Sequence, residues 1–302
     1  MNILRRLKRS GFYRMCIYYC RKYAPKSLRP KILVNTWKKV CGDGEGYDFA
    51  NPRTYTQKIQ WLKLYDSTPI KSQLTDKVAV REWIKDKIGE EYLIPVIGVY
   101  DHFEDIDFKS LPNQFVIKLN HGSGWNVVVK DKTKLDVNDA KKRIKKWMKL
   151  DFSFWSVYEM HYSPIKPRIL IEKYVEDSKG KLSDYKFLAF DGIVKYCWMD
   201  FDRAERHKRN VYDLEWNLQP WNQYTYGNYE GTVDKPKNFE EMCRIATILS
   251  EGFNHVRIDL YNVDGKIYFG EMTFTNGSGL EKITPKEYDS MLGNMLTLPE
   301  KR

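Results

Sequence analysis

Apolar residues recur along the chain with two spacings, one typical of helices and one typical of strands. A spacing of three and four predicts helices over 55–66, 72–89, 136–150 and 238–253, the second of them ending at Gly89. Apolar runs predict strands over 92–101, 115–120, 125–131 and 168–175, and strand pairs over 184–202 and 255–275. Each pair turns at an Asp-Gly step, Asp191-Gly192 and Asp264-Gly265. This mixture predicts an α+β or mixed α/β fold, with more antiparallel pairing than a Rossmann sheet.

The length and composition allow one large domain or two smaller ones. The chain has 302 residues, of which 42% are hydrophobic and 15% aromatic, which excludes disorder as the main state. No apolar run reaches the roughly eighteen residues of a membrane span, and the N-terminus does not have the pattern of a secretory signal. Five scattered cysteines indicate reduced thiols, so we expect a cytoplasmic protein: Cys16, Cys20, Cys41, Cys197 and Cys243.

Basic charge is concentrated at the start of the chain. The net charge is +11, and 12 of the 51 Lys and Arg residues lie in residues 1–42, which contain no Asp or Glu. Residues 43–302 contain the other 39 basic residues and all 40 acidic ones, so this part of the chain is nearly neutral. Residues 1–42 fit contact with an anionic membrane surface, and a helix packed on the body with a solvated basic face is the alternative. We expect no nucleic-acid binding, because no RNP-like, zinc-finger or recognition-helix motif accompanies the charge.

The stretch "FVIKLNHGSGWNVVVKDK", residues 115–132, contains the first candidate binding site. Two predicted strands flank Gly122, Ser123 and Gly124, and Lys118 lies in the first strand. A strand follows the glycines, which excludes a Walker A loop, and the lysine precedes them, which excludes a kinase loop. Taken alone, the pattern favours an ordinary hairpin. It also fits a lid over phosphates, because residues without Cβ let backbone N–H groups approach an anion.

A second cluster of residues suits a divalent cation. Arg257 and Asp259 lie two apart on one predicted strand, and Glu271 and Thr273 lie two apart on the next, so each pair shares a face of its strand. Where the strands pair, Asp259 and Glu271 can converge on Mg²⁺, which takes one or two carboxylates together with phosphate oxygens. The alternative is a surface ladder in which Arg257 pairs with Glu271.

The end of the strand over 168–175 is a weaker candidate. Glu172, Lys173, Tyr174 and Val175 follow an apolar run and can offer backbone N–H and C=O groups to the edge of an adenine. A charged residue at a strand end is common, so this segment alone is weak evidence for a nucleotide site and is considered together with the two clusters above.

Together these segments resemble the ATP-grasp family, and more closely its TupA-like branch, which is associated with bacterial surface-polysaccharide gene clusters. The resemblance spans residues 51–298 and lies in "TDKVAVREWI", "FVIKLNHGSGWNVVVKD", "ILIEKYVED", "DYKFLAFDG", "VRIDLY" and "GEMTFTNGSGLEKITP". It implies an ATP-grasp fold in which two α+β subdomains grip ATP. The implied regions are a basic amphipathic segment over 1–45, a reduced N-terminal region over 46–111, a lid subdomain over 112–175 and a C-terminal subdomain with the metal site over 176–302.

The resemblance also implies roles for individual residues. Arg257 would steady the transition state together with Lys118 and Lys186, and the metal ligands would be Asp259, Glu271 and Thr273. Thr273 departs from the family, which has Asn at this position, and Asn276 is the alternative ligand. The implied nucleotide-binding residues are Lys77, Lys118, His121, Gly122, Ser123, Gly124, Glu172, Lys173, Tyr174, Val175, Asp184 and Lys186.

The activity that the resemblance implies is an ATP- and Mg²⁺-dependent carboxylate–amine ligase that works through an acyl phosphate. The implied substrates are a uronic-acid-containing saccharide or polysaccharide precursor and an amino acid or another amine, joined at the inner face of the membrane. Substrate contacts are expected from Asn276, Gly277, Ser278 and Gly279, and from Arg203 and Arg206 in the aromatic, basic stretch 198–216. Two alternatives are a glycosyltransferase, with one Asp-x-Asp match at 200–202, and a non-catalytic scaffold of the same fold.

Overall fold

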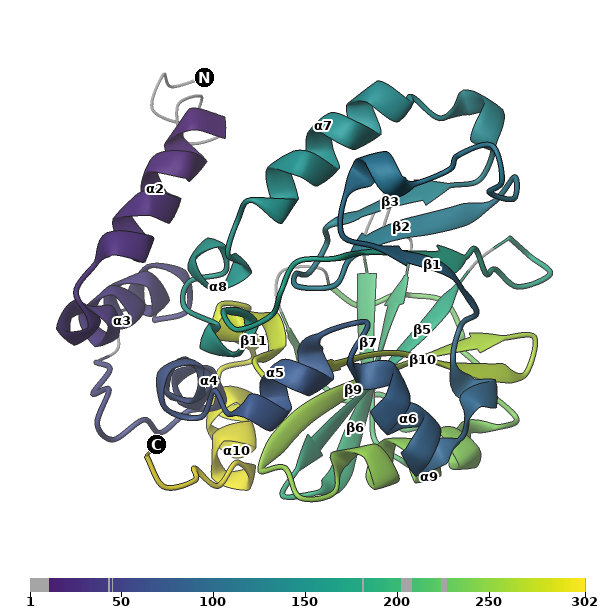
Figure 1. The fold of residues 1–302 in the computed structure, drawn as a ribbon. Coiled ribbons are helices and arrows are strands. Elements are labelled where there is room, and N and C mark those ends of the chain that lie inside the picture. Colours follow the sequence, from purple (N-terminus) through teal and green to yellow (C-terminus); the bar gives the residue numbers. More distant parts are fainter. Residues whose placement is uncertain are drawn as a thin grey trace.

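The computed structural model describes residues 11–42, 44, 46–180, 182–201, 208–223 and 227–301. Two antiparallel sheets form its centre, one above the other in Figure 1. The small sheet has the strand order β1-β4-β2-β3, and the large sheet has the order β10-β9-β5-β6-β7. The short strands β8 (Asn222–Gln223) and β11 (Ile283–Thr284) pair separately. The predicted α+β class with antiparallel pairing is therefore confirmed.

The small sheet is built from β1 (Val96–Tyr100), β2 (Phe115–Leu119), β3 (Asn126–Val129) and β4 (Ile169–Lys173). Alternate residues of β2, such as Ile117, are fully buried, and α7 (Val137–Met148) packs on β2 through Ile144. The helix predicted over 136–150 is confirmed as α7, and Lys142, Lys145 and Lys146 on its polar side are exposed to solvent. The hairpin predicted for 115–131 is present, since β2 pairs with β3 in register.

The large sheet is built from β5 (Ser183–Phe190), β6 (Ile193–Phe201), β7 (Lys208–Tyr212), β9 (His255–Val263) and β10 (Lys266–Thr273). Alternation along β9 divides its side chains between two faces. Ile258 and Leu260 join the apolar core under α9 (Phe239–Ser250), whereas Arg257 and Asp259 lie on the opposite face. Part of that opposite face is covered by α4 (Tyr55–Tyr65) and α10 (Glu287–Met295), which share a core with Leu188. The remainder carries the charged residues described below.

The single helix predicted over 72–89 is wrong, because the structure has two helices there. These are α5 (Pro69–Thr75) and α6 (Val80–Ile88), with Asp76 between them. The Asp76 carboxylate accepts hydrogen bonds from the backbone N–H groups of Val78 and Ala79, and from Asn120 Nδ2 in the loop after β2. An aspartate that accepts from the backbone N–H groups two and three residues further on favours a turn over a continuous helix. Gly89 ends α6 as predicted.

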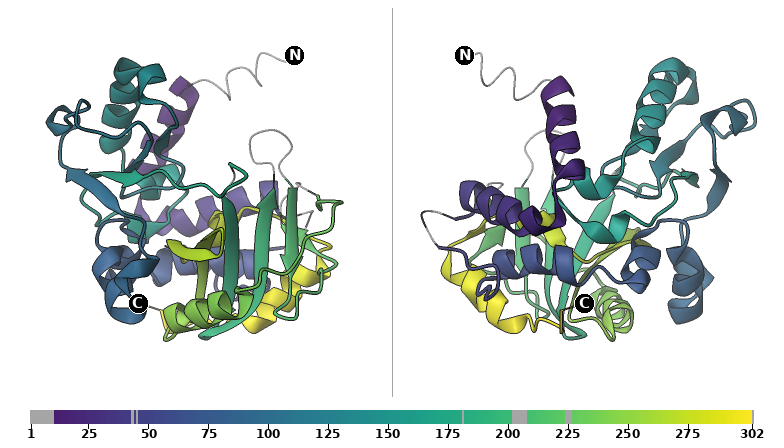
Figure 2. Two further views of the ribbon diagram at one scale, coloured as in Figure 1. Left: turned by 90° about the vertical axis from the view of Figure 1, so that its right-hand side faces the viewer. Right: turned by 60° about the vertical axis from the view of Figure 1, so that its left-hand side comes forward.

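The N-terminal helices lie at the edge of the molecule, where Figure 2 shows α2 extending away from both sheets. They are α2 (Gly11–Tyr23) and α3 (Arg29–Val40), and α2 packs against α8 (Phe152–Trp155). Within the described ranges, no helix combines the length and the apolar character that crossing a bilayer requires. The 3-10 turns are η1 (Lys26–Leu28), η2 (Glu90–Tyr92), η3 (Phe103–Asp105), η4 (Lys132–Lys134), η5 (Met160–Tyr162) and η6 (Asn276–Gly279).

Candidate active site

An extra residue in β10 sets the position of the two candidate metal ligands. From the turn up to Phe269, β10 pairs with β9 in regular steps, with Phe269 opposite Leu260. The register then shifts at Gly270, so that Glu271 lies opposite Asp259. A regular hairpin would place Glu271 opposite Ile258, on the other face of the sheet. This β-bulge therefore brings the two carboxylates to facing positions on neighbouring strands.

The Arg257 guanidinium holds this cluster together. Its Nε and Nη2 donate to the two oxygens of Asp259 at 2.6 and 2.7 Å, and Nη2 also donates to Glu271 Oε1 at 3.1 Å. Nη1 donates to Asn276 Oδ1 at 2.6 Å, and Thr273 Oγ1 lies 3.1 Å from both Nη2 and Glu271 Oε1. The Arg257–Glu271 pair of the surface-ladder alternative is thus present, but the Arg257 side chain is only 11% exposed.

Burial and nearby charges compete in this cluster. Burial raises the pKa of the Asp259 carboxyl, against the opposing effect of Arg257 and Lys186. Burial acts in the same direction on Glu271, but Lys77, Arg257 and Lys186 outweigh it and hold the pKa of Glu271 below its usual range. Burial alone would lower the pKa of Arg257, yet Asp259 and Glu271 raise it above its ordinary value. Glu271 is therefore an anion at neutral pH and can bind a cation.

The donor set of this cluster fits Mg²⁺ only together with other ligands. In the part of the chain that the structure describes, no group of three or more His, Cys, Asp or Glu side chains is placed to hold a metal. Mg²⁺ needs fewer protein ligands, because it is usually bound by one or two carboxylates plus phosphate oxygens and water. Asp259 and Glu271 supply these two carboxylates. They fit an ion that arrives with a phosphate chain, and the metal assignment stays a prediction.

Lys186 extends the charged face across β5. Its Nζ forms a short ion pair with Asp184 and lies 3.4 Å from Asp259 Oδ2 and 3.8 Å from Asp200 Oδ2. The Asp200 side chain is only 1% exposed and accepts from Arg209 Nε at 2.6 Å. Asp200 therefore contributes to a buried ion-pair network, which gives no support to a glycosyltransferase Asp-x-Asp motif.

The proposed sugar-binding stretch 198–216 is used largely for packing. Trp198 is fully buried, and Trp216 stacks on Tyr212 with ring centroids 4.3 Å apart. Trp198 thus belongs to the core, and Trp216 is partly buried against the apolar core under α9. Arg203 and Arg206 lie outside the described residues, and their assignment stays a prediction.

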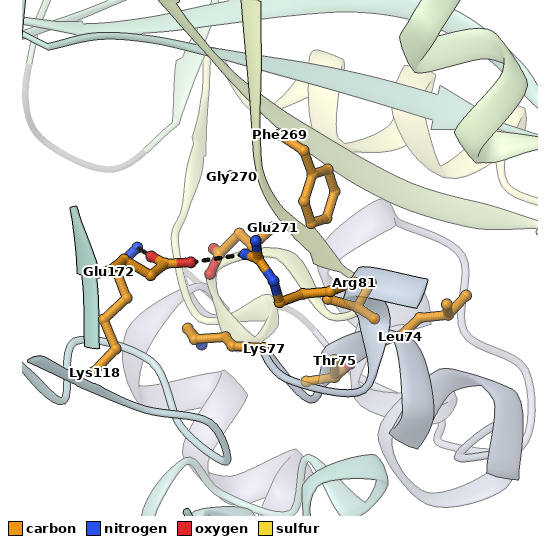
Figure 3. A pocket seen from close by; sticks show the side chains of 10 residues that line it. Leu74, Thr75, Lys77, Arg81, Lys118, Glu172, Phe269, Gly270 and Glu271 are labelled. Atoms are coloured by element: carbon orange, nitrogen blue, oxygen red, sulfur yellow. Dashed lines mark hydrogen bonds and ion pairs between the residues drawn. The ribbon is translucent and has the colours of Figure 1, made fainter. Parts of the chain in front are cut away.

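A pocket between the two sheets is lined by three of the predicted nucleotide-binding residues, Lys77, Lys118 and Glu172 (Figure 3). Lys118 Nζ lies 2.6 Å from Glu172 Oε2, and Arg81 of α6 donates to Glu172 Oε1 at 3.1 Å. Lys77 and Glu271 line the same pocket, and the charge of Lys77 lowers the pKa of Glu271. The pocket is lined by Leu74, Thr75, Lys77, Val80, Arg81, Lys118, Glu172, Phe269, Gly270 and Glu271.

The glycine turn contacts this pocket through Lys77, whose Nζ donates to the carbonyl oxygen of Gly122 at 2.7 Å. A Cβ on Gly122 would lie 2.6 Å from the Trp125 ring, so this position requires glycine. Ser123 is exposed, whereas His121 is only 2% exposed and packs edge-on against Trp125. Burial lowers the pKa of His121, which favours a neutral ring, and its nucleotide-binding role stays a prediction.

Residues 173–182 connect the two sheets, since β4 ends at Lys173 and β5 begins at Ser183. Lys173 is exposed, and Tyr174 donates from its hydroxyl to Glu176 at 2.6 Å. The segment predicted to bind adenine therefore consists of the end of β4, with the buried Glu172 and the exposed Lys173, and the start of the linker at Tyr174 and Val175. The adenine role stays a prediction.

The turn predicted to contact substrate, η6, rests on buried polar residues of α4. Gln60 Nε2 donates to the carbonyl oxygens of Ser278 and Gly279 at 2.9 and 2.7 Å, and Lys63 Nζ donates to Ser278 at 2.9 Å. Gly277 and Ser278 both have φ of 55°, a left-handed conformation that costs energy at Ser278. Burial lowers the pKa of Lys63 to about 7, against the opposing effect of Glu159.

Three residues of this region were not predicted from the sequence: the buried donors Gln60 and Lys63, and Arg81, which pairs with Glu172. The signal for the first two is a polar stripe at positions 57, 60 and 63 within a helix that is otherwise buried. Arg81 gives no comparable signal, because arginine on an amphipathic helix is ordinarily solvated.

Comparison with known proteins gives one family match. A family model described as "TupA-like ATPgrasp" matches residues 57–297. Among solved structures, D-alanine–D-alanine ligase from Bacillus anthracis complexed with ATP is 18% identical, with 74% of this chain and 65% of that chain covered and a TM-score of 0.47. The ATP-grasp ligase PsnB complexed with a minimal precursor is 10% identical, with coverage of 80% and 66% and a TM-score of 0.43. This chain thus spans slightly under two thirds of the length of both, and no curated protein matches it.

Proposed function

This chain belongs to the TupA-like ATP-grasp family, and on that premise we propose that it is an ATP-dependent ligase that joins a carboxylate to an amine. One observation carries the proposal. Lys77, Lys118 and Glu172 line the same pocket as Glu271, although they come from four separate segments of the chain. Lysines and carboxylates that line one pocket suit a nucleotide phosphate chain with its metal ion.

The proposed reaction has two steps. A substrate carboxylate oxygen attacks the γ-phosphorus of ATP, the bond from that phosphorus to the bridging oxygen breaks, and ADP leaves with the electron pair. An amine then attacks the acyl carbon of the acyl phosphate, phosphate leaves, and the amine loses a proton as the amide forms. The first step is needed because hydroxide is a poor leaving group from a free carboxylic acid.

The residues of the pocket would act mainly by positioning and by neutralising charge. Lys77, Lys118 and Lys186 would offset the charge of the phosphates, and Arg257 would stabilise the oxyanion of the tetrahedral adduct. Asp259 and Glu271 would hold Mg²⁺, which would supply further positive charge against the phosphates. The glycine turn would exclude water, with Lys77 linking its position to the pocket through the Gly122 carbonyl.

The proposed substrates are a uronic-acid-containing saccharide or polysaccharide precursor and an amino acid or another amine. The turn Asn276–Gly279 is the proposed acceptor contact, because Asn276 Oδ1 receives a hydrogen bond from Arg257 at 2.6 Å. Arg203 and Arg206 remain the proposed partners of a uronate carboxylate. We place the reaction in the cytoplasm, where ATP is available.

The test is Mg²⁺-dependent ADP release by the purified full chain, supplied with uronic-acid oligosaccharides and pooled amino acids. Three proteins are compared: wild type, Glu271→Gln, and Glu251→Gln as a matched control at an exposed carboxylate after α9. We expect ADP release that needs both substrates, is lost in Glu271→Gln and is retained in Glu251→Gln. Equal activity in wild type and Glu271→Gln would exclude the metal assignment, and failure to bind ATP would exclude the nucleotide pocket.

A further inference from the structure

One face of α2 exposes aromatic residues to solvent. Phe12, Tyr19 and Tyr23 are 80%, 47% and 74% exposed. With Cys16, which is also exposed, they follow the spacing of four, three and four that places residues on one side of a helix. Tyr19 and Tyr23 stack on each other, with ring centroids 6.2 Å apart. An apolar face of this kind on a fixed helix indicates a surface that something else covers.

The opposite side of α2 anchors the helix to the body. Tyr18 is 2% exposed and accepts a hydrogen bond on its hydroxyl from the Asp151 backbone N–H at 3.2 Å. Arg21 donates to the carbonyl oxygens of Phe154 and Trp155 in α8, at 3.3 and 3.1 Å. These contacts fix the rotation of α2, so the aromatic face cannot turn inward without breaking them. Figures 1 and 2 show this helix at the outer edge of the molecule.

The charge around α2 identifies what can cover the face. Residues 1–42 contain 12 Lys and Arg and no Asp or Glu, whereas the remainder of the chain is nearly neutral. Among the described residues, no ion pair involves a cation of α2 or α3. A second copy of this chain would bring the same cations to the contact, and like charges would oppose such a pairing. A surface of negative charge over an apolar interior is complementary to both features.

We propose that α2 docks the protein on the surface of an anionic phospholipid bilayer. The aromatic face lies in the head-group region, where tyrosine and other amphipathic rings are favoured, and the basic residues contact lipid phosphates. Phe12 enters furthest, because it is the most exposed apolar residue of α2. The proposal does not depend on the ATP pocket or its chemistry.

The test is co-sedimentation of the full chain with vesicles of phosphatidylcholine alone, or of phosphatidylcholine mixed with phosphatidylglycerol. We compare wild type with a variant carrying Phe12→Ser, Tyr19→Ser and Tyr23→Ser. A matched control carries Val128→Ser, Ile193→Ser and Leu218→Ser, which are 53%, 55% and 51% exposed and lie outside α2. Circular dichroism establishes that each protein is folded, and analytical ultracentrifugation gives its oligomeric state.

We expect wild type and control to bind the anionic vesicles, and the α2 variant to bind at least about tenfold more weakly. Binding should weaken as sodium chloride is added, because salt screens the charge contacts. Equal binding to neutral and anionic vesicles, or equal binding by wild type and the α2 variant, would overturn the proposal. Absence of vesicle binding by the wild type would also overturn the proposal. A wild type that is dimeric, with a monomeric α2 variant and no vesicle binding, would show that a second copy covers the aromatic face instead.

Discussion

Acid is expected to destabilise this protein because two histidines are buried as neutral rings. His255 is fully buried, with Nδ1 2.9 Å from the Ala189 carbonyl oxygen and Nε2 3.1 Å from the Tyr55 hydroxyl. A carbonyl oxygen can only accept, so Nδ1 carries the proton and Nε2 accepts from Tyr55. His161 is 2% exposed and packs near Phe274. Burial therefore opposes a second proton on either ring.

The size of the effect follows from the pKa values. Burial lowers the pKa of His255 and of His161 from 6.5 to about 3. Between these values the unfolded chain binds a proton that the folded chain does not, so the stability is complete above pH 6.5 and is lost as the pH falls toward 3. At pH 5 each histidine costs about 2 kcal/mol, and the two together about 4 kcal/mol. This is a large part of the roughly 5–15 kcal/mol that stabilises a typical protein.

The assay is urea unfolding monitored by tryptophan fluorescence at several pH values between about 7.5 and 5. This range brackets the unfolded-state histidine pKa of about 6.5. His255→Asn keeps a donor for Ala189 and cannot titrate, so it should lose about 2 kcal/mol less than wild type over this range. His102→Asn, at an exposed histidine, is the control and should behave as wild type. If His255→Asn and wild type lose the same stability between pH 6.5 and 5, the reasoning from burial is wrong.

Three further predictions test the pocket and the core. Gly122→Ala should weaken ATP binding in calorimetry and lower stability by about 1–3 kcal/mol, because its Cβ would lie 2.6 Å from a neighbouring ring; unchanged affinity would contradict a lid held in this shape. Lys77→Met should weaken ATP binding and raise the pKa of Glu271, since Lys77 is the strongest of the charges that lower it; carbon-13 NMR of the glutamate carboxyls measures the pKa, and a value equal to wild type would contradict the proximity. Ile144→Ala in the small-sheet core should cost about 2–5 kcal/mol in urea unfolding, whereas exposed Lys142→Ala should cost almost nothing.

Elements with local determinants were predictable from the sequence. The hairpin over 255–275 has its own Asp-Gly turn and alternating apolar residues, and both are properties of neighbouring residues. The helix over 55–66 starts at a capping box between Thr54 and Gln57, which is equally local. The sequence also predicted that Asp259 and Glu271 lie close together on paired strands. It did not predict the bulge at Gly270, which brings them opposite each other.

Features that depend on distant segments were not predictable. The break at Asp76 is supported by Asn120, more than forty residues further along the chain. Gln60 and Lys63 are buried because the turn over 276–279 lies on α4, and no pattern within α4 reveals that partner.

The bulge at Gly270 has a consequence for how relatives of this protein are compared. Gly270 is the extra residue of β10, so a relative that lacks it and has a regular hairpin would place the glutamate directly after Phe269, again opposite Asp259. A relative that keeps every residue but loses the bulge would instead place Glu271 opposite Ile258, toward the apolar core under α9. The two carboxylates therefore face each other at either of two spacings from the Asp264-Gly265 turn, one with the bulge and one without it. Relatives of this protein are better aligned by the strand pairing of β9 and β10 than by a fixed number of residues between the turn and the glutamate.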